Sequence, residues 1–193
     1  MLPVDTEWHP CFFPNQQSME QNLRKEFFAY RNGIIADQLR AAGDPHTMIM
    51  GCQHIDVINI TSHYEKSASL AQSLWNDVNH RECRMAAIML YPIMEFDMTT
   101  ALAWCDSIES TEIADVLCHR LLRHLPCAVD LWDRLRDNNK PLVRYTAWRL
   151  LLNLLLMNRV KKTKQLKDLL NLDLKTAAPP LQQLLKTISQ DLQ

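Results

Sequence analysis

Glycine is scarce in this chain, with only three among 193 residues. Tight turns between β-strands depend on glycine for positive backbone φ angles, so its scarcity argues against a sheet protein. Leucine, alanine, glutamine, glutamate, lysine and arginine, which favour helix, are abundant instead. Because 47% of the residues are hydrophobic and 22% are charged, the chain has the balance of a globular domain. We therefore expect an all-α fold and a single domain over residues 1–193.

Long apolar runs are also absent. The longest, Leu150 to Met157, is interrupted by Asn153 and is far shorter than the roughly 20 residues that a membrane span requires. The first residues carry acidic side chains and prolines in place of the cationic start and apolar stretch of a signal peptide. We expect no membrane segment, a cytoplasmic location, and an irregular N-terminal arm over residues 1–16.

Paired cysteines are missing as well. The six cysteines are scattered at positions 11, 52, 83, 105, 118 and 127 with no C-x-x-C pair, which favours buried, reduced thiols. Cys118, His119 and His124 are close in sequence, but their spacing does not put three ligands on one helix face. We expect no metal and no cofactor.

The formal net charge of −1 excludes a protein that coats DNA indiscriminately, because non-specific affinity comes mostly from lysine and arginine. The charge is unevenly distributed, since residues 85–119 contain several carboxylates and no lysine or arginine. Basic residues return in the C-terminal half, at Arg120, Arg123, Arg134, Arg136, Lys140, Arg144, Arg149, Arg159, Lys161, Lys162 and Lys164. This half is the candidate surface for an anionic partner.

A sequence unit occurs twice in the chain. Leu74-Trp75 is followed by a polar turn and by Arg84, with alanine and leucine spaced three residues apart after it. Leu131-Trp132 is followed in the same way by Arg144. A repeated helix pair cannot bury its apolar face alone, so the pattern predicts a solenoid of about five or six stacked helix pairs.

Capping residues and apolar spacing divide the chain into helices. Ser18 resembles an N-cap, and Asn32-Gly33 should end or bend the first helix. The pattern predicts helices at about 18–30, 34–42, 55–63, 66–77, 80–95, 97–105, 109–125, 127–137, 140–158, 162–171 and 178–191. Four tryptophans, Trp75, Trp104, Trp132 and Trp148, lie at helical spacing among leucines and are expected in the core.

The order of motifs resembles one known family. The chain has a Met50-Gly51-Cys52-Gln53 loop, a first Leu-Trp hairpin, an acidic helix start, and a second Leu-Trp hairpin with an Asp-Asn turn. Over roughly residues 20–190 this order is similar to the AlkD-type DNA alkylation-repair glycosylases, which are built of HEAT-like helical repeats. The resemblance implies a HEAT-like solenoid that acts on duplex DNA without a metal or a cofactor.

The resemblance also implies roles for individual residues. In the family, a Trp-Asp-x-x-Asp motif opens a central helix, and its last aspartate is the catalytic carboxylate. Asp115 matches that aspartate, whereas Thr111 occupies the position of the aromatic residue. A family aromatic in the last repeat has no counterpart here. The implied DNA-contacting residues are Thr111, Gly51 and Gln53 in the loop, and Arg144 together with Lys140 and Asn139 at the start of its helix. His54 lies in a turn that could also meet DNA.

The chemistry of the reaction fits a single carboxylate. Hydrolysis of the N-glycosidic bond of a cationic alkylated purine develops oxocarbenium character on the sugar, which a fixed carboxylate such as Asp115 could stabilise while it orients water. A base that is already cationic needs no general acid to leave. Arg144 could hold a phosphate together with backbone amides at the start of its helix.

Other interpretations of the same residues remain open. Asp115 could simply be a carboxylate favoured by the dipole at a helix start, and Glu109 and Glu112 nearby would repel phosphate unless they point away. Arg84 is at least as suited to bonding between repeats, and His54 and His80 could be merely exposed polar residues. The protein could therefore be a non-enzymatic adaptor that holds a protein partner in its concave groove, or a DNA-structure binder that never cleaves.

Overall fold

The computed structural model describes residues 16–191. In that range the chain forms eleven α-helices, two short 3-10 helices and one isolated β-bridge between Met48 and His80. The helices are α1 (Gln16–Ala29), α2 (Gly33–Ala41), α3 (His54–Thr61), α4 (Ala68–Asn76), α5 (Arg81–Leu90), η1 (Ile93–Glu95), α6 (Met98–Asp106), α7 (Thr111–Arg120), η2 (Leu122–His124), α8 (Ala128–Leu135), α9 (Pro141–Leu156), α10 (Lys164–Thr176) and α11 (Leu181–Asp191). The all-α expectation is confirmed over these residues.

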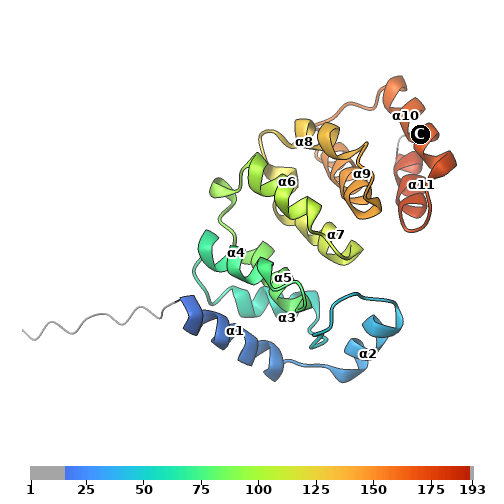
Figure 1. Ribbon diagram of the computed structural model, residues 1–193. Coiled ribbons are helices and arrows are strands. Elements are labelled where there is room, and N and C mark those ends of the chain that lie inside the picture. Colours follow the sequence, from blue (N-terminus) through green and yellow to red (C-terminus); the bar gives the residue numbers. More distant parts are fainter. Residues whose placement is uncertain (1–15, 192–193) are drawn as a thin grey trace, which may run out of the picture.

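The helices form a curved stack of two layers (Figure 1). Helices α3, α5, α7, α9 and α11 pack one against the next along the inner layer. Helices α4, α8 and α10 each pack against the inner helix that follows in the chain, and α6 contacts α8 and α9. The two sequence units are the hairpins α4–α5 and α8–α9, so the expected helical-repeat architecture is confirmed.

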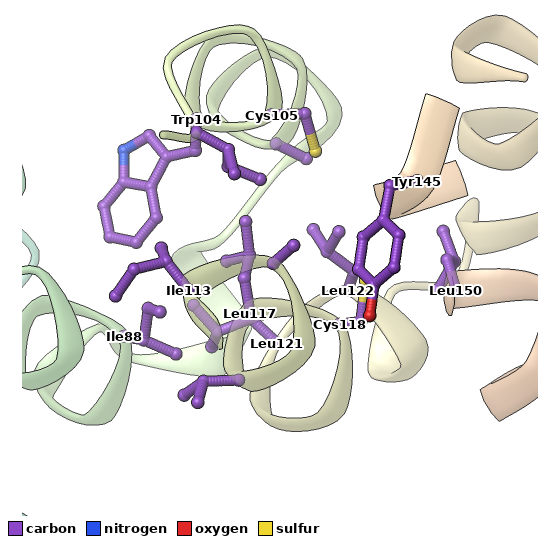
Figure 2. Close-up of a cluster of buried hydrophobic side chains, with 14 of the residues drawn as sticks. Ile88, Trp104, Cys105, Ile113, Leu117, Cys118, Leu121, Leu122, Tyr145 and Leu150 are labelled. Atoms are coloured by element: carbon purple, nitrogen blue, oxygen red, sulfur yellow. The ribbon is translucent and has the colours of Figure 1, made fainter. Parts of the chain in front are cut away.

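The hydrophobic core runs through the stack between the two layers. The closest pair of aromatic rings among the described residues joins two neighbouring repeats, since the rings of Trp75 and Trp104 stack with their centroids 4.0 Å apart. Figure 2 shows how α7 enters this core, with Ile113 and Leu117 among side chains from the adjacent helices. All four tryptophans expected in the core are buried. The inner helices are therefore fixed against each other by side chains on their buried faces.

Two predicted helices extend well past the observed C-terminal ends, whereas the helix expected over 162–171 is too short, because α10 continues to Thr176. The helix expected over 80–95 ends at Leu90, and the 3-10 helix η1 follows Pro92. Proline has no backbone N–H and cannot continue a helical hydrogen-bond ladder. The helix expected over 109–125 ends at Arg120 and is followed by η2. At the N-terminal end, α1 begins at Gln16, before the predicted cap at Ser18; the rest of the predicted arm lies outside the described residues.

The remaining expectations for the fold concern cysteines, histidine and membrane spans. Cys52, Cys83, Cys105 and Cys118 are buried free thiols, Cys127 is half-buried, and Cys11 lies outside the described residues. The expectation that His80 is exposed is wrong, because its side chain is fully buried beneath the segment that leads to α3. Between residues 16 and 191, no helix has the length and apolar character needed to cross a bilayer.

Candidate catalytic carboxylate and nucleic-acid interface

Helix α7 presents Asp115 on the face opposite its core side chains. The helix is capped by Ser110, whose hydroxyl accepts a hydrogen bond from the Ile113 amide at 3.2 Å. Apolar residues point into the core, while Thr111 and Asp115, one turn apart, remain half-buried. They open into a depression of about 470 Å³ that is lined by His54, Thr111, Glu112, Asp115, Val116, His119 and Arg120. The amphipathic pattern of α7 thus directs a carboxylate toward an open surface.

One carboxylate oxygen of Asp115 receives both of its contacts from α9. The Tyr145 hydroxyl donates a hydrogen bond to Oδ1 at 2.9 Å. Arg149 Nε lies 3.2 Å from the same oxygen as an ion pair. No residue between 16 and 191 forms a hydrogen bond or an ion pair with Oδ2. The Asp115 side chain is 38% exposed, so Oδ2 has access to a molecule in the depression.

Partial burial sets the electrostatics of Asp115. Loss of hydration raises the pKa of its carboxyl above the ordinary aspartate value, and Glu112 adds to that rise. The Arg149 guanidinium and the Tyr145 hydrogen bond act in the opposite direction and lower the pKa. The ionised carboxylate is therefore less well solvated than a surface aspartate, and its charge is directed toward the depression.

Glu112, one turn before Asp115, is bound through both of its oxygens. Arg81 Nε and Nη2 donate to Glu112 Oε2 and Oε1 at 2.6 and 2.5 Å. Arg81 Nη1 also donates to Glu82 Oε1 at 2.8 Å and to the Cys52 carbonyl at 3.1 Å. We name Arg81, Glu82 and Glu112 the Arg81 network. The guanidinium pairs with Glu112 but shares its single positive charge with Glu82, so the acid next to Asp115 has an ion-pair partner while the network keeps a net negative charge.

The Arg81 network also holds the loop that leads into α3. Glu82 is fully buried and accepts hydrogen bonds from the amides of Met50 and Gly51 at 3.1 and 3.0 Å. Gly51 has a φ of +77°, and a Cβ there would lie 2.1 Å from the Asn32 carbonyl oxygen. Only glycine fits this close approach. The Gly51 amide is therefore occupied within the protein, and the position serves the packing of the loop.

The same loop brings His54 to the depression. Gln53 is exposed before α3, and its amide donates to Asp56 Oδ2 at 2.8 Å. The next residue, His54, is half-buried and lines the depression with Asp115. Burial lowers the pKa of His54, and the positive charge of Arg120 lowers it further. His54 is thus a neutral hydrogen-bonding group at the edge of the depression.

The predicted residues at the start of α9 lie outside the depression. Arg144 Nη2 pairs with Asp173 Oδ2 of α10 at 3.1 Å. Lys140 Nζ pairs with Asp106 Oδ1 of α6 at 2.7 Å, and Asn139 is exposed. Both cations therefore have carboxylate partners within the chain, which a phosphate would have to displace.

Sequence analysis missed the two residues that hold Asp115. Tyr145 and Arg149 are four residues apart, a spacing that places them on the same face of α9. In the sequence, Arg149 is only one of several basic residues of the C-terminal half. The helical-hairpin repeat makes α7 and α9 neighbours. Together with the four-residue spacing, it could have identified both residues as partners of Asp115.

Among residues 16–191, no group of three or more histidine, cysteine, aspartate or glutamate side chains is arranged to hold a metal ion. Cys118 is fully buried against the Thr146 carbonyl, whereas His119 is exposed. The polar groups that line the depression are therefore two carboxylates, a threonine hydroxyl, two imidazoles and one guanidinium group.

Comparison with known proteins gives one match. The profile of the family described as DNA alkylation repair enzyme matches residues 23–182, which includes every helix from α2 to α10. No curated protein and no solved structure matches the chain.

Proposed function

The chain belongs to the DNA alkylation repair enzyme family, and we propose that it binds duplex DNA and hydrolyses the N-glycosidic bond of N3- or N7-alkylated purines with Asp115. One observation carries this proposal: Asp115 is anchored through Oδ1 alone and leaves Oδ2 open to the depression. A carboxylate that is fixed through one oxygen keeps the lone pairs of the other oxygen for a bound substrate or water.

Hydrolysis at this site requires no metal and no cofactor. The bond between the sugar C1′ and the alkylated base breaks, and the cationic base takes the bonding electrons and leaves as a neutral molecule. Asp115 Oδ2 stabilises the positive charge that develops on the sugar and orients the attacking water. The water oxygen bonds to C1′, and its proton passes to the carboxylate and then to solvent.

Tyr145 and Arg149 fix the direction of the catalytic carboxylate in this proposal. Both contact Oδ1 from α9, which is held against α7 by buried side chains (Figure 2). The rotation of Asp115 is therefore restricted before a substrate binds. A carboxylate oriented in advance stabilises the transition state without a further reorganisation cost.

The DNA contacts that we propose surround the depression. His54 and Thr111 line it, and Gln53 is exposed in the adjoining loop. Arg144, Lys140 and Asn139 at the start of α9 would contact backbone phosphates, with the two cations exchanging Asp173 and Asp106 for DNA. Gly51 contributes by allowing the loop to pack closely. Because Thr111 replaces the family aromatic, selection of the lesion relies on the weaker glycosidic bond of a cationic base more than on stacking.

The test measures release of free 3-methyladenine and 7-methylguanine from methylated duplex DNA by the native chain and by Asp115→Asn. We expect release by the native chain and loss of release in the variant, while both bind duplex DNA with a steep salt dependence. Binding without release would indicate a DNA-structure binder. A lack of DNA binding at every salt concentration would overturn the proposal and favour an adaptor for a protein partner.

A further inference from the structure

Exposed aromatic and apolar side chains lie close together in the sequence at the junction of α1 and α2. Phe28 is 54% exposed, Tyr30 is 52% exposed and Ile34 is 73% exposed. We name Phe28, Tyr30, Arg31 and Ile34 the junction patch. Soluble proteins rarely leave neighbouring large side chains of this kind open to water without a binding role. Within the described residues, no other helix junction exposes two aromatic rings.

Cations accompany the rings of the junction patch. The Arg31 guanidinium lies 4.0 Å from the centroid of the Phe28 ring, and its Nη1 donates to the Phe28 carbonyl at 3.0 Å. Lys25 is exposed one turn before Phe28. Flat rings alternating with cations are typical of surfaces that bind nucleic acid, because bases stack on the rings while phosphates pair with the cations.

The carboxylates around the junction patch have hydrogen-bond or ion-pair partners within the protein. The Glu26 carboxylate accepts a hydrogen bond from the Tyr64 hydroxyl, with an O···O distance of 2.5 Å. Asp37 pairs with Arg40 at 2.9 Å, and Arg40 also donates to the Ile49 carbonyl at 3.3 Å. Because the Tyr64 hydroxyl is neutral, Glu26 keeps its negative charge, but the two cations Lys25 and Arg31 outnumber it beside the rings, which suits an anionic partner.

The junction patch is continuous with the loop that borders the depression. The Asn32 amide donates to the Met50 carbonyl at 2.8 Å, and Gly51 packs against the Asn32 carbonyl. A second open depression of about 460 Å³ lies between the two segments and is lined in part by Arg31, Arg40 and Met50. From Met50 the loop continues through Gln53 to His54, which lines the depression that contains Asp115. A DNA strand near Asp115 can therefore extend along this loop to the patch.

We propose that the junction patch binds an unpaired nucleobase of the same DNA, with Phe28, Tyr30 and Arg31 as stacking surfaces and Arg31 as a partner for the adjoining phosphate. This inference rests on the proposed function, since it assigns a second contact to the DNA that Asp115 acts upon. It predicts that the protein prefers duplexes with a single-stranded overhang or gap to fully paired, blunt duplexes.

The experiment compares two probes, a blunt duplex and the same duplex with a single-stranded overhang that carries 2-aminopurine, a base whose fluorescence falls on stacking. The native chain should bind the overhang probe more tightly and quench its fluorescence. Phe28→Ala combined with Tyr30→Ala should weaken binding to the overhang probe about tenfold or more and abolish the quenching. The same variant should bind the blunt duplex and release methylated bases as the native chain does.

Leu172→Ala provides a matched control, because Leu172 is 62% exposed on α10, toward the other end of the stack. It should leave both affinities unchanged, and Tyr30→Phe should retain the quenching because its ring remains. Equal affinity of the native chain for both probes, or unchanged overhang binding in the double variant, would overturn the inference and leave the proposed function intact. Failure of the native chain to bind either probe would overturn both.

Discussion

Two carboxylates one turn apart on α7 are held in different ways. Glu112 is bound through both oxygens by the Arg81 guanidinium, which also joins buried Glu82 and the loop before α3. Asp115 is bound through Oδ1 alone, by Tyr145 and Arg149, and keeps Oδ2 open to the depression. The first arrangement satisfies an acid completely, whereas the second leaves hydrogen-bonding capacity for a ligand. Glu112 therefore supports the structure, and we propose that Asp115 is the acid available for chemistry.

The largest expected change in stability comes from removing the cation of the Arg81 network. Arg81→Met leaves the buried Glu82 without its cation and frees both oxygens of Glu112. Loss of one partner from a buried ion pair costs about 3–5 kcal/mol, so the unfolding free energy should fall by that amount in urea denaturation. Lys140→Met, which breaks the exposed pair with Asp106, should cost at most about 1 kcal/mol. Equal losses in the two variants would contradict a structural role for the network.

The next effect concerns the hydroxyl that orients Asp115. Tyr145→Phe removes the donor to Oδ1 while the aromatic ring stays in the core. Hydrogen bonds to charged groups contribute about 1.5–3 kcal/mol, which corresponds to at least a tenfold lower rate of base release if that energy fixes the catalytic geometry. Duplex affinity should stay the same. An unchanged release rate would show that Arg149 alone is sufficient to hold the carboxylate.

The pKa of Asp115 gives a pH test. Burial raises this pKa above the ordinary aspartate value of about 3.9. When the pH is lowered, the rate of base release should therefore begin to fall at a higher pH than an ordinary aspartate would give. The raised pKa also means that the ionised carboxylate is disfavoured in the folded state at neutral pH. Asp115→Asn should therefore unfold at the same temperature as the native protein, or at a higher one, at neutral pH. As the pH falls through the raised pKa, the Asp115 carboxyl becomes protonated, and the native protein should gain stability relative to the variant. A variant that unfolds at a clearly lower temperature would indicate a structural role for Asp115.

The smallest expected effect concerns the start of α9. Arg144→Ala breaks the ion pair with Asp173 Oδ2, an oxygen that also accepts a hydrogen bond from the Trp148 indole N–H at 2.8 Å. The cost in stability should be at most about 1 kcal/mol. If Arg144 contacts a phosphate, the slope of log affinity against log salt should decrease by about 1. An unchanged slope would limit Arg144 to the contact between α9 and α10.

Arg84 and Arg144, which occupy the same position in the two hairpin units, show what the sequence pattern could predict and what it could not. The Leu-Trp hairpin unit predicted both helix pairs, because apolar spacing and turn residues are local signals. It did not predict that Arg84 is fully buried, with its guanidinium 3.7 Å from the centroid of the Trp75 ring and a hydrogen bond to the Trp75 carbonyl at 2.7 Å. Burial lowers the pKa of Arg84 to about 10. Arg144, at the same place in the second unit, is partly exposed and pairs with a carboxylate of the following helix. Neighbouring repeats, which the unit itself does not encode, decide the difference.

The Arg81 network was beyond sequence analysis for the same reason. Arg81 and Glu82 are adjacent, but their partners lie in the loop at residues 50–52 and at Glu112 on α7. Only the packing of α5 against α7 and against this loop brings the three segments together. Placing Asp115 on an open face was within reach, because the apolar spacing of α7 leaves only one side of that helix for polar residues.

The most direct test measures single-turnover release of 3-methyladenine by Asp115→Asn and by Glu112→Gln, each normalised to the folded fraction. These substitutions remove one charge each from positions one turn apart on the same helix. We expect release by Asp115→Asn to drop by about a hundredfold or more toward the uncatalysed rate, and Glu112→Gln to retain release within a few-fold per folded molecule while it loses stability. Equal release by the two variants, or a greater loss in Glu112→Gln, would contradict the assignment of Asp115 as the catalytic carboxylate.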